Sequence, residues 1–293
     1  MWFESKLYEE LKEQEEDIIM INCLNENPLY KYLDDLMRLN ITQENYLKLI
    51  ELCDFLMVTN IDILVDKIVQ YFGTHIIHNF GNFYKYNSQR LQVHDKKSLE
   101  QAIKLYCKNK EKCYETYGFS AYWNVSNITN MDCMFKNSDF NGDISQWNVS
   151  NVTTMYSMFE HSKFNGDISQ WNVSNVKTMS YMFESSKFDN DISQWDVSNV
   201  TNMVALFDTS NFNGDISQWN VSNVENMCAM FNGSKFNRDI SKWDVSNVKN
   251  MEGMFRNSEF NCDISQWNVS NITTISYIFH NSKFNGYLSQ WNM

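Results

Sequence analysis

The chain has 293 residues, of which 24 are basic and 36 are acidic, and its net charge is −12. This charge repels the phosphate backbone of nucleic acid, so we expect no nucleic-acid partner. One proline and nine glycines exclude a long linker rich in those residues, and no apolar run reaches the ~20 residues that a membrane-spanning helix needs.

Apolar residues spaced three and four apart fill the first third of the chain, which indicates amphipathic helices. We expect helices over residues 3–20, 27–39, 43–58 and 61–72, and we assign residues 1–79 to one helical domain. The charged N-terminal segment has no cationic stretch followed by an apolar core, so no signal peptide is expected there. Seven cysteines, an odd number without a Cys-x-x-Cys pair, indicate reduced and mostly buried thiols. Together these features predict a cytoplasmic protein.

Residues 28–72 carry a more specific pattern. Asn40-Ile-Thr42 leads into the segment ENYLKLIELCDFL, and a further helical pattern follows. This arrangement resembles the rear half of a BTB/POZ domain, and repeat proteins of amoebal giant viruses look similar in pairing such segments with repeat arrays. The resemblance implies a substrate adaptor for a cullin-type ubiquitin ligase, with Leu52 and Phe55 on the partner surface. For a viral protein it would also imply a place in the host cytoplasm.

Residues 80–118 connect this domain to the rest of the chain. The first part of this connector has no strong periodicity, and residues 97–109 have the pattern of a helix. Because the exposed end of a repeat array needs a cover, we expect this helix to cap the first repeat.

The remaining chain is a repeat of 24 residues. Tryptophan recurs at positions 123, 147, 171, 195, 219, 243, 267 and 291, and the motif DISQWNVSNV of residues 143–152 returns around most of them. A fixed period of roughly 20 to 50 residues indicates stacked units, each too small to bury its own apolar face. Residues 119–293 are therefore predicted to form a solenoid of about seven rungs.

Within one unit, the apolar spacing predicts one strand and one helical turn. The pattern IxxWxVxxV at 144–152 has leucine-rich-repeat spacing, and the alternation of Trp147 and Val149 predicts a short strand. The pattern MxxMF at 155–159 predicts one turn of helix. Asn-Gly at 141–142 marks a turn, with an unusual backbone conformation expected at the asparagine. We predict an α/β fold, a leucine-rich-repeat-like right-handed solenoid with a parallel sheet along one face.

The complete unit, FNGDISQWNVSNVTTMYSMF, resembles the BspA-type repeat of bacterial surface proteins, known best from mycoplasma lipoproteins. The resemblance covers residues 119–293. It implies a leucine-rich-like solenoid used for adhesion or for protein contacts.

Stacking turns each repeat position into a column, and three polar columns lie on the expected strand face. Stacked amide and hydroxyl groups can hydrogen-bond along a column, so one interpretation is a polar ladder that satisfies itself. The other interpretation is a groove that binds an extended partner or a glycan. Its candidate binding residues are Gln146, Asn148, Ser150, Gln170, Asn172, Gln194, Asp196, Gln218, Asn220, Lys242 and Asp244.

Aspartate forms a further column, with Asp143, Asp167, Asp191, Asp215, Asp239 and Asp263. Like charges at the spacing of rungs repel, so each carboxylate needs a compensating interaction. One interpretation is that each carboxylate accepts backbone N–H groups at its turn. The other is calcium between the rungs, as in a calcium- or glycan-binding adhesin, but no second acidic column supplies the roughly six to eight oxygens that calcium takes. We assign no metal site and no cofactor.

Other columns change from unit to unit. They include Tyr156-Ser157 and Glu160-His161 and the positions equivalent to them in the other units. One interpretation is drift at solvated positions, and the other is that these columns carry partner specificity.

Catalytic motifs are absent from the sequence, and its five histidines are scattered. We therefore predict a non-enzymatic protein–protein interaction module, in which the solenoid presents its polar strand face and its variable edges to another protein. The alternatives are the cullin adaptor and the adhesin. Because the repeat pattern decays towards Trp291 and an uncapped edge attracts other chains, we also expect self-association through the last rung.

Overall fold

The computed structural model describes residues 93–118 and 120–291. The chain divides into two compact units, Met1–Gln89 and Arg90–Met293, and the described residues belong to the second. The predicted helical domain of residues 1–79 and its BTB-like segment, with Leu52 and Phe55, lie outside the described residues. The cullin hypothesis therefore stays a prediction.

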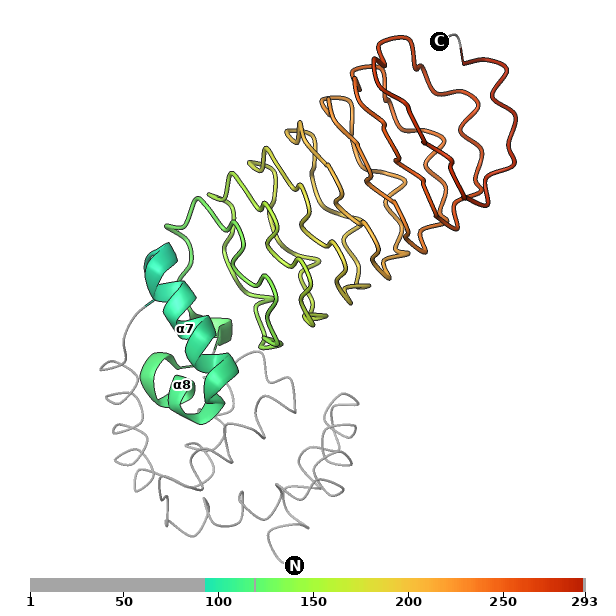
Figure 1. Cartoon of the computed structure of the whole chain (residues 1–293). Helices are drawn as coiled ribbons and strands as arrows, with labels where there is room; N and C mark the ends of the chain where they lie inside the picture. The colour runs from blue at the N-terminus through green and yellow to red at the C-terminus, as the bar shows by residue number, and fades with distance from the viewer. Residues whose placement is uncertain (1–92, 119, 292–293) are drawn as a thin grey trace, which may run out of the picture. The chain divides into compact units, whose positions relative to one another are not determined.

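Two short helices lead into the repeat (Figure 1). Helix α7 spans Lys96–Lys108, one residue earlier at each end than the expected 97–109, and α8 spans Lys110–Tyr117. A single 3-10 turn, η1, follows at Ser120–Tyr122.

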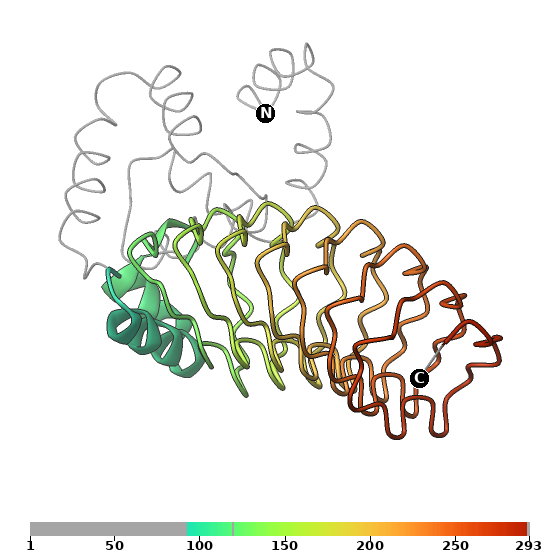
Figure 2. The ribbon, with the colours of Figure 1, turned by 90° about the horizontal axis from the view of Figure 1, so that it is seen from above.

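After η1 the chain winds into a stack of coils (Figures 1 and 2). We name each coil by its tryptophan, so that the Trp171 coil runs from residue 164 to residue 187. Isolated parallel bridges pair each coil with the next one at Asn130–Thr154, Thr154–Thr178, Thr178–Asn202, Asn202–Asn226, Asn226–Asn250 and Asn250–Thr274. The spacing of 24 residues is therefore kept along the whole stack. From residue 123 to residue 291 the described chain contains no helix and no strand beyond these single bridges.

A backbone ladder joins neighbouring coils along one face. In the Trp147 coil, every second N–H group of residues 155–161 donates to a carbonyl of the next coil, 23 positions later in the sequence. The pairs are Met155–Thr178, Ser157–Ser180, Phe159–Met182 and His161–Glu184, at 2.8–3.1 Å. Between them, the N–H groups of Met158 and Glu160 donate inside the coil, to the carbonyl three residues earlier, and that of Tyr156 donates to the Asp132 carboxylate of the preceding coil. Each coil thus offers donors to the coil after it and acceptors to the coil before it.

The ladder lies elsewhere in the unit than the expected strand. The Trp147 amide donates to the Ile144 carbonyl at 3.1 Å, inside its own coil, so the expected strand around Trp147 and Val149 is a series of turns. The segment 155–159, expected to be helical, is also a series of turns and carries the ladder.

The segment 155–159 forms turns and not a helix because the backbone is left-handed at two positions of nearly every coil. Ser157 has a φ of 53° and His161 a φ of 54°, and most of the equivalent residues share this conformation. A left-handed residue every four positions stops a right-handed helix and produces turns that need a positive φ at their third residue. The unusual conformation expected at Asn141 is therefore found at these two columns instead.

Aromatic columns fill the core of the stack. The Phe183 ring stacks on Phe159 and Phe207 in the neighbouring coils, with centroids 5.6 and 5.7 Å apart and planes within 3°. Each tryptophan from Trp147 onward also ties its coil to the one before. The Trp171 Nε1 group donates to the Ile144 carbonyl at 3.0 Å, and later tryptophans repeat this bond.

Helix α7 packs against the first coil, the Trp123 coil. It begins with a capping box, in which the Asp95 carboxylate accepts from the Ser98 amide at 2.7 Å and the Ser98 hydroxyl accepts from the Asp95 amide at 3.1 Å. Its buried side chains, Leu99, Ala102 and Ile103, belong to the same hydrophobic cluster as the repeat core. The apolar stripe of α7 thus continues the core of the stack.

The C-terminal end of the stack, from Ile272 in the Trp267 coil to Leu288 in the Trp291 coil, is less well buried. Six of its apolar side chains are only partly buried, whereas their equivalents in earlier coils are fully buried. They are Ile272, Ile275, Ile278, Phe279, Phe284 and Leu288. The predicted self-association through the last rung stays a prediction.

The expectation of mostly buried thiols is wrong for the described cysteines. Cys113 is buried, and burial raises the pKa of its thiol to about 12. Cys107 and Cys133 are exposed, and Cys228 and Cys262 are half-buried. Cys133, Cys228 and Cys262 lie in repeat columns at the surface of the coils. All five described cysteines are free of disulfides.

Candidate functional site

The polar columns are satisfied inside each coil. Asn148 Oδ1 accepts from the Ser150 amide at 3.1 Å and from its hydroxyl at 2.7 Å, and Gln146 Nε2 donates to Ser145 Oγ at 3.3 Å. These contacts recur along the stack, whereas the expected bonds between stacked amides are absent from the described columns. The reason is local, because an asparagine that turns back onto the residue two positions later has no need of a neighbouring coil.

The two aspartates among the candidate residues of this face follow the same rule. Asp196 accepts from the Ser198 amide and Asp244 from the Ser246 amide, both at 3.0 Å, and the hydrogen bonds from these serines lower the pKa of both carboxyls. The predicted binding residues of this face therefore lie in columns that differ little from coil to coil. They are Gln146, Asn148, Ser150, Gln170, Asn172, Gln194, Asp196, Gln218, Asn220, Lys242 and Asp244.

The aspartate column is also satisfied locally. Asp143 Oδ1 accepts the Ser145 amide at 2.9 Å, and the other five aspartates make the same bond. The backbone hydrogen bond lowers the pKa of Asp215, Asp239 and Asp263. The interpretation that each carboxylate accepts an N–H group at its turn is confirmed. No group of three or more His, Cys, Asp or Glu side chains in the described ranges has the arrangement of a metal site.

One face of the stack differs from coil to coil, and we call it the variable face. It comprises four columns on the ladder segment, and in the Trp147 coil their members are Tyr156, Ser157, Glu160 and His161. In the Trp195 coil the same positions are Val204, Ala205, Asp208 and Thr209, and in the Trp243 coil they are Glu252, Gly253, Arg256 and Asn257. Two of these columns carry the left-handed residues, so the backbone is uniform while the side chains change.

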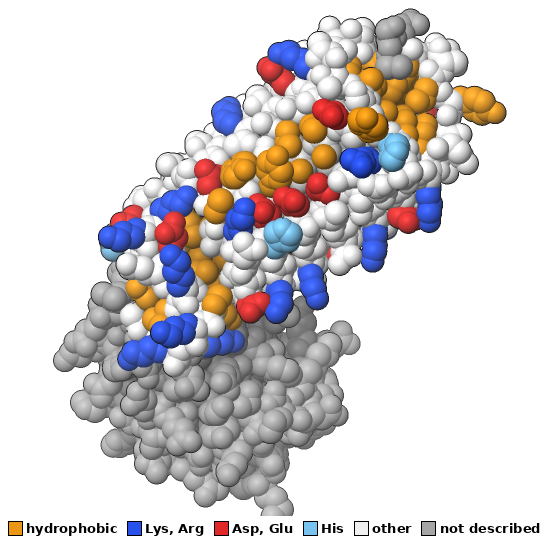
Figure 3. All heavy atoms as spheres, in the orientation of Figure 1, with side chains coloured by type: hydrophobic (Ala, Val, Ile, Leu, Met, Phe, Trp, Pro, Cys, Tyr) orange, Lys and Arg blue, Asp and Glu red, His pale blue; other side chains and the backbone are white. Residues whose placement is uncertain are grey.

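Three carboxylates lie in a row at the centre of the variable face. Glu160, Glu184 and Asp208 occupy one column in successive coils, and Figure 3 shows acidic side chains beside hydrophobic ones in the middle of the stack. Lys136 neutralises the first of them, with its Nζ 2.7 Å from Glu160 Oε1. Burial alone would raise the pKa of Glu160, but Lys136 and the nearby Ser157 hydroxyl outweigh it and lower that pKa.

The other two carboxylates have no such neighbour. Burial raises the pKa of Glu184, and the charges of Glu160 and Asp208 add to the rise. Burial also raises the pKa of Asp208, against the hydrogen bond that Asn232 Nδ2 donates to it at 3.0 Å. No ion pair compensates either group within the described residues. The ionised forms of Glu184 and Asp208 therefore lower the stability of the fold.

This loss of stability predicts that the difference in unfolding free energy between Asp208→Asn and the parent depends on pH. A carboxyl whose folded pKa is raised weakens the fold above that pKa, and the penalty disappears as the pH falls through it towards the unfolded value. The Asp208→Asn variant should therefore be more stable than the parent at pH 7, and the difference should vanish near pH 4. Urea denaturation at several pH values measures this, and a difference that is constant with pH would contradict it.

Aromatic and hydroxyl groups adjoin the carboxylate row. The Tyr156 side chain is 42% exposed, and its ring meets that of Tyr181 edge to face with centroids 5.5 Å apart. Ser157 Oγ is fully buried beside the Glu160 carboxylate, whose pKa it lowers. The variable face therefore combines two unneutralised carboxylates and an aromatic pair.

Two stretches of the chain, residues 103–211 and 205–293, match the model of a family described as Mycoplasma protein of unknown function, DUF285. Together the two matches cover well over half of the chain. No curated protein and no solved structure matches the chain. Within the described ranges, no helix is both long and apolar enough to cross a membrane.

Proposed function

The chain belongs to the family described as Mycoplasma protein of unknown function, DUF285, and from this premise we propose that it is a non-enzymatic protein-binding module. In this proposal residues 119–293 form a leucine-rich-repeat-like solenoid that contacts another protein. The BspA-type resemblance implies both this fold and this use. The partner binds the variable face.

The observation that carries the proposal is the contrast between the columns. The polar and aspartate columns repeat one set of side chains, and their hydrogen bonds close inside each coil. A surface of this kind presents the same features at every coil and cannot define one position along the stack. The variable face differs at every coil, so it can distinguish one partner in one register.

The chemistry of the variable face favours a cationic partner segment. Glu184 and Asp208 carry charges that burial disfavours, and an arriving lysine or arginine would relieve that penalty. The exposed Tyr156 ring, in contact with Tyr181, offers an aromatic face to the same cation. The partner that fits best is therefore a protein segment bearing lysine or arginine.

A binding experiment with matched variants tests the proposal. The probes are fluorescein-labelled peptides that carry two arginines one to four residues apart, with citrulline in place of arginine as the neutral control. The double variant Glu184→Gln, Asp208→Asn should bind the best arginine peptide about tenfold or more weakly, since each charge-assisted hydrogen bond contributes ~1.5–3 kcal/mol. Fluorescence polarisation of the full-length protein measures the affinity.

The control variant changes the charge equally on the polar face of the same two coils. Gln170→Lys with Gln194→Lys, in the Trp171 and Trp195 coils, likewise raises the net charge by two, but away from the variable face. We expect it to lower the affinity by no more than about twofold, which is the effect of long-range charge alone. Equal losses in both double variants would refute the variable face as the binding surface, and so would equal binding of arginine and citrulline peptides.

A further inference from the structure

The ladder of the stack has an open edge in the Trp123 coil. In every later coil, the carbonyls equivalent to those of Asp132, Met134 and Lys136 accept N–H groups from the coil before. In the Trp123 coil only the Asp132 carbonyl has a donor, the Nζ group of Lys96 in α7, at 3.0 Å. The carbonyls of Asn130, Met134 and Lys136 accept no hydrogen bond from the described residues. Among the described residues, two of these acceptors, Met134 and Lys136, thus stand two residues apart without a donor.

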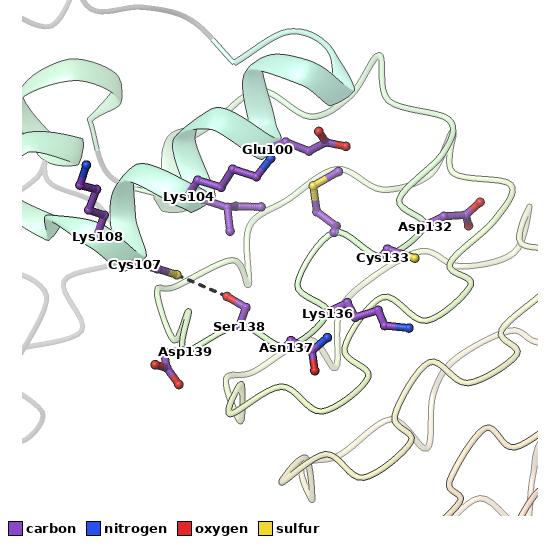
Figure 4. A pocket seen from close by; sticks show the side chains of 12 residues that line it. Glu100, Lys104, Cys107, Lys108, Asp132, Cys133, Lys136, Asn137, Ser138 and Asp139 are labelled. Atoms are coloured by element: carbon purple, nitrogen blue, oxygen red, sulfur yellow. Dashed lines mark hydrogen bonds between the residues drawn. The ribbon is translucent and has the colours of Figure 1, made fainter.

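A groove runs along this edge, between α7 and the Trp123 coil (Figure 4). Its volume is about 620 Å³, which lies in the range of pockets that hold ligands. Helix α7 lines one side with Glu100, Lys104, Cys107 and Lys108, and the segment 132–139 lines the other. The groove and the open acceptors thus occupy the same place.

The charged groups of the coil side are already engaged with the next coil. Lys136 pairs with Glu160 at 2.7 Å, and Asp139 pairs with Lys163 at 2.8 Å. The Asp132 carboxylate accepts hydrogen bonds from the Thr154 hydroxyl and the Tyr156 amide.

The charges left over belong to α7. They are Glu100, Lys104 and Lys108, none of which forms an ion pair within the described residues. Lys104 and Lys108 are four residues apart and therefore neighbours on one face of α7. With two lysines and one glutamate, the charge available to a ligand in this groove is thus net positive by one, and Lys108 is the cation farther from Glu100 along α7.

We propose that this groove binds an extended peptide segment with acidic side chains, which takes the place of a preceding coil. The N–H groups of alternate peptide residues donate to the carbonyls of Met134 and Lys136, because the ladder pairs every second residue. A carboxylate of the peptide meets Lys104 and Lys108. The variable columns begin in one wall of this groove, at Asp132, Cys133, Lys136 and Asn137. The proposal can nevertheless fail separately from the proposed variable-face function, since it takes its charge from Lys104 and Lys108 in place of Glu184 and Asp208 and its ligand has the opposite charge.

The experiment probes the backbone pairing directly. A fluorescein-labelled hexapeptide of alternating threonine and glutamate is titrated with the full-length protein. Two analogues carry N-methyl groups on all glutamate amides or on all threonine amides. We expect one analogue to bind about tenfold or more weakly and the other within about twofold of the parent peptide, because only one set of N–H groups faces the edge.

The charge contribution is tested with matched lysine variants. Lys104→Gln with Lys108→Gln should weaken binding of the parent hexapeptide about tenfold, while Lys97→Gln with Lys187→Gln, equal in charge but outside the groove, should leave it within about twofold. The Glu184→Gln, Asp208→Asn variant should bind the hexapeptide as the unmodified protein does. The proposal is overturned if both N-methylated peptides bind like the parent, if the two lysine variants behave alike, or if the parent hexapeptide does not bind.

Discussion

Replacing Trp195 by alanine is expected to lower the free energy of unfolding by about 3–5 kcal/mol, the range for removing a large buried aromatic side chain. The indole is 3% exposed and packs near Phe183, with ring centroids 6.3 Å apart. Its Nε1 group donates to the Ile168 carbonyl of the preceding coil at 3.0 Å. The substitution therefore leaves a cavity in the core and removes one of the two hydrogen bonds that the Ile168 carbonyl accepts, the other coming from the Trp171 amide at 3.1 Å. Guanidinium denaturation followed by circular dichroism measures the loss.

Two control variants separate these contributions. Trp195→Phe keeps most of the packing and removes the hydrogen bond, so we expect it to cost about 1–3 kcal/mol. Gln194→Ala changes the exposed neighbour, whose amide bonds only to Ser193 at 3.2 Å, and should stay within about 0.5 kcal/mol. A Trp195→Ala protein with an unchanged denaturation midpoint would mean that this coil is not packed as described.

Ala205→Val is expected to cost about 3 kcal/mol, because the substitution combines a left-handed backbone with a buried site. Ala205 has a φ of 51°, is 2% exposed, and donates its N–H group to the Cys228 carbonyl at 2.8 Å. A β-branched side chain is strained at this φ, and because Ala205 is already buried, two more methyl groups must displace neighbouring atoms. The midpoint of guanidinium denaturation measures the loss.

Matched substitutions show whether the backbone conformation is the cause. Ala205→Gly removes the strain of the left-handed residue but loosens the unfolded chain, so we expect a change within about 0.5 kcal/mol. Cys228→Val places the same side chain in the neighbouring column, where Val204 already stands, and should also be tolerated within about 1 kcal/mol. If Ala205→Val were as stable as Cys228→Val, the left-handed conformation of this column would be wrong.

The turn chemistry of the repeat could be predicted from the residues themselves. Asp143 and its equivalents were expected to accept N–H groups at their turns, and each bonds to the serine two residues later. This prediction holds because the donor and the acceptor lie within one turn of chain, where residue type dominates the geometry. The helix over 97–109 could be predicted for the same reason, since its capping box and its apolar stripe are both local patterns.

The left-handed columns had a weak signal in the sequence, and it was missed. The column of His161 also contains Asn137, Asn257, Asn281 and Gly233, and these residue types tolerate a positive φ. The column of Ser157 carries a weaker signal, because Gly253 is its one glycine and its other members include tyrosines and alanines. The spacing of Met155, Met158 and Phe159 suits a helix equally well, so periodicity alone could not distinguish the helix from the turns.

The sequence by itself determined the period of 24 residues, the apolar positions that face the core, and the satisfied aspartate turns. These properties depend on which residues recur and on contacts within a few positions. Only the tertiary structure decided where the backbone ladder runs, which columns hold left-handed residues, and which carbonyls remain open beside α7. The physical reason is that ladder partners are 23 residues apart. Their pairing therefore depends on how whole coils stack, and the side chains that line the open groove come from two elements that meet only in the folded chain.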